Sequence, residues 1–333
     1  MSNSSSTIPP AAAAPPRLER ALRSLRGLAT GDALGERFFV NPHTVEQLID
    51  ARAVPRGNWG YTDDTVMALA VVENLAEFGR IEPRALALGF GAKYTADPGR
   101  GYGPSMHRTL QALHAGADYR EVAQAPFGGS GSMGNGGAMR AAPLGAFWAP
   151  GSAAPAAALD AAWRHVVAEA RLSAAVTHAH PEGQAGAEAV ALAAAWVAWS
   201  AEQGEGRPSA ELFEVVLAHT TPGETSARIE RAAALPLDYD VRTAVSALGN
   251  GSQVLAQDTV PFCLWCVARH LGDYAAAFWT TVSGLGDRDT TCAIVGGILT
   301  SDPRVRAPAE WTRQRESLAA MSRQPPLQGL EDV

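Results

Sequence analysis

The chain has 333 residues, of which 47% are hydrophobic and 18% are charged, so it can bury a large core and general disorder is excluded. Its 27 basic and 34 acidic residues give a net charge of −7, which argues against a dedicated nucleic-acid binding surface. Residues 1–16 are rich in serine, alanine and proline and carry no basic region or long hydrophobic stretch. They predict a disordered N-terminal tail rather than a signal peptide.

Alanine- and leucine-rich segments separated by glycine, proline and polar residues follow this tail. They predict helices, and no stretch has the alternation typical of strands. We therefore expect one all-α domain over residues 17–303 and a more polar, loosely packed C-terminal tail over residues 304–333. No apolar stretch predicts a membrane span, and the protein is expected to be cytoplasmic. The predicted helices cover Leu18–Leu28, Thr65–Phe78, Pro83–Tyr94, Ser105–Ala115, Ala154–Ala175, Glu182–Gln203, Ser209–His219, Val241–Leu248, Thr259–Leu271, Tyr274–Ser283 and Thr291–Leu299.

Three cysteines are too few for a disulfide framework in a chain of this length. Cys263 and Cys266 match the C-x-x-C pattern, but they lie in the apolar run Val260–Val267. Residues at positions i and i+3 share one face of a helix. This placement favours a structural role over redox chemistry or metal binding.

Two acidic motifs of the same form stand directly before apolar helices. The first contains Thr62, Asp63 and Asp64, and the second is Asp287-Arg-Asp289-Thr290-Thr291. Capping of a helix N-terminus would explain one acidic residue in each motif but not two. If the motifs meet, the carboxylates repel by about 4 kcal/mol per close pair at an effective dielectric near 20, and one or two divalent ions would remove that repulsion. Oxygen ligands without an adjacent His or Cys favour Mg²⁺ or Mn²⁺ over zinc.

The region Pro98–Gly137 is rich in glycine and is predicted to be mostly loop. Its last part runs from Gly131 through Ser132, Met133, Gly134, Asn135 and Gly136 to Gly137. Backbone N–H groups of small residues can approach a phosphate or diphosphate closely, although a plain flexible loop is the alternative.

A pair of histidines precedes the helix that is predicted to begin at Glu182. In Thr177-His178-Ala-His180-Pro181 the two histidines neither share a helix face nor have a usual zinc spacing. A ligand contact and capping of the following helix both remain open.

Together these segments resemble the ADP-ribosylglycohydrolase family, which includes dinitrogenase reductase-activating glycohydrolase and the ADP-ribosyl-acceptor hydrolases. Motifs matching the family pattern occur in family order over nearly the whole predicted domain. The matching segments are Gly27-Leu-Ala-Thr-Gly31-Asp32-Ala-Leu-Gly35, Trp59-Gly-Tyr-Thr62-Asp63-Asp64-Thr65, Arg100-Gly-Tyr-Gly103, Gly134-Asn-Gly-Gly-Ala-Met-Arg140, Thr177-His178-Ala-His180-Pro181 and Gly286-Asp287-Arg-Asp289-Thr290-Thr291.

The resemblance implies an orthogonal helical bundle with a two-Mg²⁺ centre, or Mn²⁺ in some members, and cleavage of the glycosidic bond between ADP-ribose and an acceptor. The implied metal ligands are Thr62, Asp63, Asp64, Asp287, Asp289 and Thr290, and Asp63 or Asp64 could also orient the attacking water. Residues implied to contact the ADP-ribose or ADP-ribosylated substrate are Gly103, Ser105, Ser132, Met133, Gly134, Asn135, Gly136 and His178.

One position departs from the family pattern. Many members carry a glutamate seven residues after the aspartate that corresponds to Asp32, and here that position is Phe39. Glu36 is the only nearby acidic residue and is a candidate replacement. The alternatives are that this branch works without the glutamate or that its activity is altered.

Two other functions remain open. One is a catalytically altered ADP-ribose binder or a structural protein, because the family fold also occurs as a lens crystallin. The other is a metal-dependent phosphohydrolase on an unrelated helical fold. The two complete acidic motifs favour the hydrolase over a binder, and the glycine-rich loop favours it over a phosphohydrolase.

Overall fold

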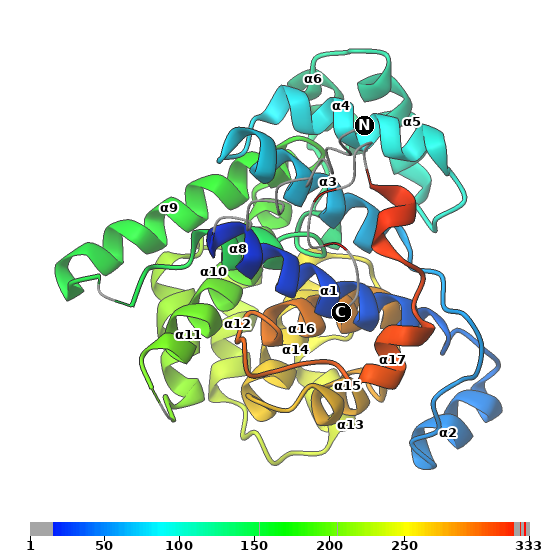
Figure 1. Ribbon diagram of the computed structural model, residues 1–333, viewed down its shortest axis with the longest axis vertical. Helices are drawn as coiled ribbons and strands as arrows, with labels where there is room; N and C mark the ends of the chain where they lie inside the picture. Colours follow the sequence, from blue (N-terminus) through cyan, green and yellow to red (C-terminus); the bar gives the residue numbers. More distant parts are fainter. Residues whose placement is uncertain (1–15, 153, 205, 323–326, 328–329, 331–333) are drawn as a thin grey trace, which may run out of the picture.

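The computed structural model describes residues 16–152, 154–204, 206–322, 327 and 330. Within them the chain forms seventeen α-helices, two short 3₁₀ helices and two isolated β-bridges, with no sheet (Figure 1). The predicted all-α class is confirmed. The elements are α1 (Pro16–Glu36), α2 (Pro42–Asp50), α3 (Asp63–Phe78), α4 (Pro83–Ala96), α5 (Pro104–His114), α6 (Tyr119–Gln124), α7 (Pro126–Gly129), η1 (Asn135–Gly137), α8 (Ala142–Trp148), α9 (Ala156–Ala175), α10 (Pro181–Glu202), α11 (Ser209–His219), α12 (Glu224–Ala234), α13 (Val241–Leu248), α14 (Ala256–Arg269), α15 (Tyr274–Val282), α16 (Arg288–Leu299), α17 (Ala309–Gln314) and η2 (Leu318–Met321).

Most predicted helices are present. The largest differences are one helix that is longer than predicted and several helices that were not predicted. Helix α1 continues eight residues beyond the predicted end at Leu28. Helices α2, α6, α7, α8, α12 and α17 were not predicted, and α6 and α7 lie in the region 98–137 that was predicted to be mostly loop. The signals for α2 are a capping Asn41, whose side chain accepts from the Thr44 N–H, and Pro42 in its first turn.

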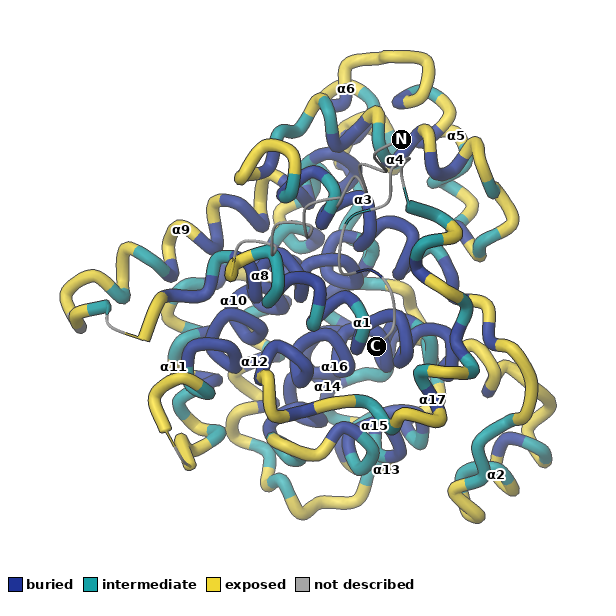
Figure 2. Tube along the Cα trace, viewed as in Figure 1, coloured by how far each residue is buried: buried dark blue, intermediate teal, exposed yellow. Residues whose placement is uncertain are grey.

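The middle of the molecule is formed by α1, α10, α14 and α16, which are buried along most of their length (Figure 2). Helix α10 is alanine-rich, so neighbouring helices can approach it on several sides. Its one interior acidic residue, Glu188, is fully buried and accepts from the Arg171 side chain at 2.8 Å and the Thr221 N–H at 2.8 Å. This pairing satisfies a carboxylate that would otherwise be costly inside the core.

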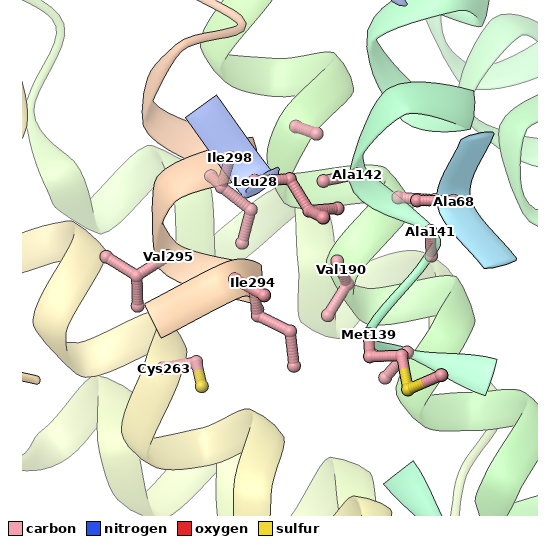
Figure 3. Close-up of a cluster of buried hydrophobic side chains, with 14 of the residues drawn as sticks. Leu28, Ala68, Met139, Ala141, Ala142, Val190, Cys263, Ile294, Val295 and Ile298 are labelled. Atoms are coloured by element: carbon pink, nitrogen blue, oxygen red, sulfur yellow. The ribbon is translucent and has the colours of Figure 1, made fainter. Parts of the chain in front are cut away.

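The three cysteines are free and buried, and Cys263 lies within an apolar cluster contributed by several helices (Figure 3). Burial raises the pKa of Cys266 to about 12. A protonated, buried thiol is unreactive, which supports the predicted structural role of the C-x-x-C pair.

The C-terminal segment is packed more closely than predicted. Trp311, Arg315 and Leu318 are buried. The Trp59 N–H donates to the Gln314 carbonyl at 2.7 Å, and the Trp59 carbonyl accepts from the residue 316 N–H at 2.8 Å. The prediction of a loosely packed tail is therefore wrong for residues 309–318. Apart from Pro16, the disordered tail predicted for residues 1–16 lies outside the described residues.

No helix among the described residues combines the length and apolar character needed to cross a membrane.

Helices α1 and α16 pack with their backbones in close contact. A Cβ atom at Gly27 would lie 2.6 Å from the Gly296 carbonyl oxygen, and one at Gly31 would lie 2.2 Å from the Cys292 carbonyl oxygen. One at Gly35 would lie 2.4 Å from the Arg288 carbonyl oxygen. The spacing of four residues places these glycines on one face of α1, so the C-terminal end of α1 meets the start of α16.

This packing gives a stability prediction. We expect Gly31→Ala to lower the free energy of unfolding by about 3 kcal/mol, because backbone atoms of two helices must move apart. Gly89→Ala in α4 is the matched control, since a Cβ there meets nothing within 4 Å and should stabilise the helix by about 0.5–1 kcal/mol. Urea unfolding measures both. Equal stability of Gly31→Ala and wild type would contradict the close packing.

Candidate active site

The start of α3 is tied to α1 through Asp32, which is fully buried. Its carboxylate accepts from the Thr62 N–H at 3.0 Å and hydroxyl at 2.9 Å, and from the Thr65 N–H at 3.1 Å and hydroxyl at 2.5 Å. Asp32 was not among the predicted site residues. The sequence feature that could have identified it is a charged residue between Gly31 and Ala33 in a segment that is otherwise apolar.

The first acidic motif caps α3, as the simpler interpretation of the sequence proposed. The Thr62 hydroxyl accepts from the Asp64 N–H at 3.3 Å and lies 3.0 Å from the Asp64 carboxylate. The Asp63 N–H donates to the Arg100 carbonyl at 2.7 Å. Asp64 is buried, whereas Asp63 is partly exposed. Capping uses the threonine and leaves both carboxylates available.

The second acidic motif does not use its side chain as a cap. Asp287 occupies the N-cap position of α16 but makes no capping hydrogen bond. Its carboxylate instead accepts from the Asn135 side-chain amide at 2.7 Å. The same amide donates to the Thr259 hydroxyl at 3.1 Å. Asn135 therefore joins the glycine-rich loop to the start of α16.

The two acidic motifs meet, although they are more than 220 residues apart in sequence. The Thr290 hydroxyl donates to the Asp64 carboxylate at 3.3 Å. Asp64 Oδ1 and Asp289 Oδ1 are buried and have no hydrogen-bond partner in the part of the chain that the structure describes. We call the five carboxylates the acidic cluster; they belong to Asp32, Asp63, Asp64, Asp287 and Asp289.

The acidic cluster is electrostatically unfavourable as it stands. Burial and the charge of Asp289 raise the pKa of Asp32 to about 7. The same two causes raise the pKa of Asp287 to about 7. The pKa values of Asp63 and Asp64 are also raised, by burial first and then by neighbouring carboxylates. Such a cluster attracts a cation that neutralises it.

The carboxylates are gathered without being arranged around a single point. Across the described residues, no three His, Cys, Asp or Glu side chains are grouped so that they could hold one ion as they stand.

The glycine-rich loop lies against His178. A Cβ at Gly136 would be 2.9 Å from His178 Cε1, and one at Gly134 would be 3.4 Å from His178 Nε2. Neither glycine has a positive φ, whereas Gly131 has φ +74° and lies against the Ala179 and His180 backbone. Close approach to the imidazole thus accounts for the small residue at 136, whereas the tightest neighbour of a Cβ at 134 is Ser132 Oγ at 3.1 Å.

The two predicted histidines have different surroundings. The His180 ring accepts from the Glu182 N–H at 3.1 Å and caps α10. His178 is buried, with its Nδ1 2.7 Å from the Thr177 hydroxyl. Burial, and then the charge of Arg140, lower the pKa of His178 to about 3, so its ring is neutral near pH 7.

The segment that begins at Arg100 supports the first acidic motif. Its guanidinium forms a two-point ion pair with Glu316 at 2.6 and 2.9 Å and donates to the Tyr61 carbonyl at 3.0 Å. A Cβ at Gly101, which has φ +88°, would lie 3.7 Å from Asp63 Oδ1.

Of the remaining predicted ligand contacts, Gly103 is the N-cap residue directly before α5 and Ser105 lies in the first turn of that helix. Ser105 lines a cavity of about 480 Å³ together with Arg108 and Phe127. Ser132 accepts from the Gly134 N–H at 3.1 Å, and Met133 Sδ lies 3.5 Å from the Gln257 amide. Ser105 thus lies in a cavity wall between α5 and the α6–α7 segment, apart from the 132–137 loop.

The region that departs from the family pattern lies at the end of α1. The Glu36 side chain keeps contact with solvent, but neighbouring atoms displace part of the water around its carboxyl; this partial desolvation, and then the charge of Asp289, raise its pKa. Phe39 is 47% exposed, and its ring stacks under the Arg288 guanidinium at 4.5 Å. The Arg288 guanidinium also donates to the Phe38 carbonyl. Phe39 therefore packs on the residue between the two aspartates of the second motif.

Comparison with known proteins identifies the family of the chain. The ADP-ribosylglycohydrolase family model matches residues 13–323. ADP-ribosylhydrolase ARH3 from Bos taurus is 32% identical over 272 residues, which cover 72% of this chain and 69% of that protein. The Homo sapiens ARH3 is also 32% identical, over 271 residues that cover 72% and 69% of the two chains. An ADP-ribosylglycohydrolase-related protein complex shares the fold, with TM-score 0.60, 24% identity and coverage of 92% of this chain and 95% of that one. The chain belongs to the ADP-ribosylglycohydrolase family.

Proposed function

We propose that this protein is a hydrolase that uses Mg²⁺ to cleave the glycosidic bond between ADP-ribose and an acceptor. The family membership supports a hydrolase acting on ADP-ribose glycosidic bonds. The metal dependence rests on one observation: two acidic motifs from opposite ends of the chain converge on a buried site next to a glycine-rich loop.

The residues at this site fit a hard divalent cation. The available donors are carboxylate and hydroxyl oxygens, which suit Mg²⁺ or Mn²⁺. Two buried carboxylate oxygens, Asp64 Oδ1 and Asp289 Oδ1, find no hydrogen-bond partner among the described residues. The residues that would hold one or two ions are Thr62, Asp63, Asp64, Asp287, Asp289 and Thr290. Without a cation the carboxylates repel one another, which opposes a converged arrangement.

Bound ions would lower the pKa of a water and orient the ribose hydroxyls. Cleavage at the anomeric carbon develops positive charge on the sugar, which the surrounding carboxylates stabilise. Asp63 is the partly exposed member of the first motif, so its carboxylate can reach a water at the surface of the site. Asp64 is buried behind it and hydrogen-bonded to Thr62 and Thr290, which suits holding a fixed position.

The substrate would extend from the acidic cluster across the glycine-rich loop. Asn135 bonds to Asp287, so the loop and the cluster are adjacent. Ser132, Met133, Gly134, Gly136 and His178 would contact the diphosphate. Gly103 and Ser105 would contact the substrate from the side of α5, where the cavity next to Phe127 offers room for an aromatic group.

Phe39 favours a second candidate, a catalytically altered relative that binds ADP-ribose without hydrolysing it. An apolar ring stands where many family members carry a glutamate. A panel of ADP-ribose conjugates, linked through arginine, serine, acetyl, base or small-molecule acceptors, distinguishes the two. The proposed hydrolase releases ADP-ribose from at least one conjugate, only with Mg²⁺ or Mn²⁺. Tight ADP-ribose binding without release from any conjugate would support the altered relative.

The loop assignment predicts the behaviour of Gly136→Val. We expect it to weaken ADP-ribose binding at least tenfold, about 1.4 kcal/mol, because the new side chain would meet the His178 ring and cover the loop backbone. Mg²⁺ affinity should stay nearly unchanged. Gly151→Val is the control, since a Cβ there meets nothing within 4 Å. Calorimetry measures both ligands, and ADP-ribose affinity within twofold of wild type would show that the loop is not the diphosphate site.

A further inference from the structure

A fully buried arginine lies beneath the glycine-rich loop. Arg140 has no exposed surface, and among the described residues its guanidinium hydrogen-bonds only to neutral groups. One guanidinium nitrogen donates to the Gly136 carbonyl at 2.8 Å. The other donates to the Ser173 carbonyl at 3.0 Å and to the Thr177 hydroxyl at 2.8 Å. The guanidinium also stacks on Phe90, 4.6 Å from the ring centroid.

This arrangement is costly for folding. A buried charge with no acidic side chain at ion-pair distance carries a large desolvation penalty, which neutral acceptors and the more distant charge of Asp63 offset only in part. Burial accordingly lowers the pKa of Arg140 to about 9. A neutral side chain of similar size would avoid this penalty. The groups that the guanidinium contacts therefore indicate what a charged residue contributes at this position.

The contacts of Arg140 favour one direction for the hydrogen bond between the Thr177 hydroxyl and His178 Nδ1. A threonine hydroxyl often donates to the carbonyl four residues earlier, which for Thr177 is Ser173. Arg140 already donates to that carbonyl and to the hydroxyl oxygen, which favours donation of the hydroxyl proton to His178 Nδ1, 2.7 Å away. A neutral imidazole that accepts at Nδ1 carries its proton on Nε2.

His178 Nε2 faces the glycine-rich loop and has no hydrogen-bond partner among the described residues. We propose that Arg140 is a positioning residue: acting through Thr177, it fixes His178 as a neutral Nε2–H donor for a ligand oxygen that can only accept, such as a diphosphate oxygen. This inference rests on the proposed function for the identity of the ligand. Arg140 also holds the Gly136 carbonyl, so one side chain sets both the donor and the loop beside it.

A matched pair of substitutions at position 177, one without a hydroxyl and one with it, provides the sharpest test. Thr177→Val keeps the shape and removes the hydroxyl, whereas Thr177→Ser keeps the hydroxyl. Nitrogen-15 NMR of the histidine rings reports the tautomer, and the spectrum of His178→Gln assigns the His178 signals. We expect the Nε2–H tautomer in wild type and Thr177→Ser, and a mixture of tautomers in Thr177→Val with ADP-ribose affinity about tenfold lower.

Arg140→Lys tests the origin of the effect. A lysine has no planar fork and cannot donate to Gly136, Ser173 and Thr177 together, so we expect the same tautomer mixture and loss of affinity. If that variant does not fold, the Thr177 pair still decides. An Nδ1–H tautomer in wild type, or wild-type tautomer and affinity in Thr177→Val, would overturn the proposal. An Nε2–H tautomer in a wild type that binds no ADP-ribose would instead overturn the proposed function and leave the positioning of His178 intact.

Discussion

Asp289→Asn should bind Mg²⁺ at least tenfold more weakly than wild type and lose most of its hydrolytic activity. The charge of Asp289 contributes to the raised pKa values of Asp32, Asp64 and Asp287, so this carboxylate lies among all the others. Even the residues that surround metal ligands typically contribute 10- to 100-fold to affinity, and a ligand itself should contribute no less. Calorimetric titration of Mg²⁺ into the metal-free protein measures the change.

The same variant should be more stable than wild type when no metal is present. Neutralising one carboxylate relieves repulsion on its neighbours, and we expect a gain of about 1–2 kcal/mol, or about 1–3 °C in melting temperature. Added Mg²⁺ should reverse the order of stability. Asp238→Asn, an exposed residue in a turn, is the control and should change neither property. Equal Mg²⁺ binding by Asp289→Asn and wild type would refute a shared metal site.

Glu36→Gln should lower turnover about 100-fold while leaving ADP-ribose binding nearly intact. Glu36 ends α1 immediately after Gly35, which packs against the Arg288 carbonyl and the Asp289 Cα. The charge of Asp289 contributes to the raised pKa of Glu36, so the carboxylate is close enough to the acidic cluster to orient a water there. Loss of such a group typically costs a factor of 10² to 10⁴ in rate.

Two further variants give this experiment its controls. Glu46→Gln, on the exposed face of α2, should have wild-type kinetics. Phe39→Glu should fold normally, because Phe39 is 47% exposed, and a carboxylate there restores the family pattern next to Arg288. We expect its activity to equal or exceed that of wild type. Unchanged turnover in Glu36→Gln would assign the handling of water to the metal ions and the first acidic motif.

The fold class was predictable because helix-forming composition is a local property. Helices α3, α11 and α13 have a capping residue or an apolar pattern that is visible in a short window, and their limits were predicted within two residues. The end of α1 was not predictable in this way. Glycines at 27, 31 and 35 would shorten an isolated helix, and here they persist because the backbone of α16 packs against them.

The sequence by itself determined the two acidic motifs, the glycine-rich loop and the departure at Phe39, because each is a short run of unusual residue types. Only the tertiary structure decided that the motifs meet, because their contact depends on the packing of α1 against α16. Asp32 and Arg140 were missed as parts of the site for the same reason: the role of a buried charge depends on partners that lie 30 or more residues away. The function of such a residue is set by the hydrogen bonds that compensate its burial, and those form only when the helices are assembled.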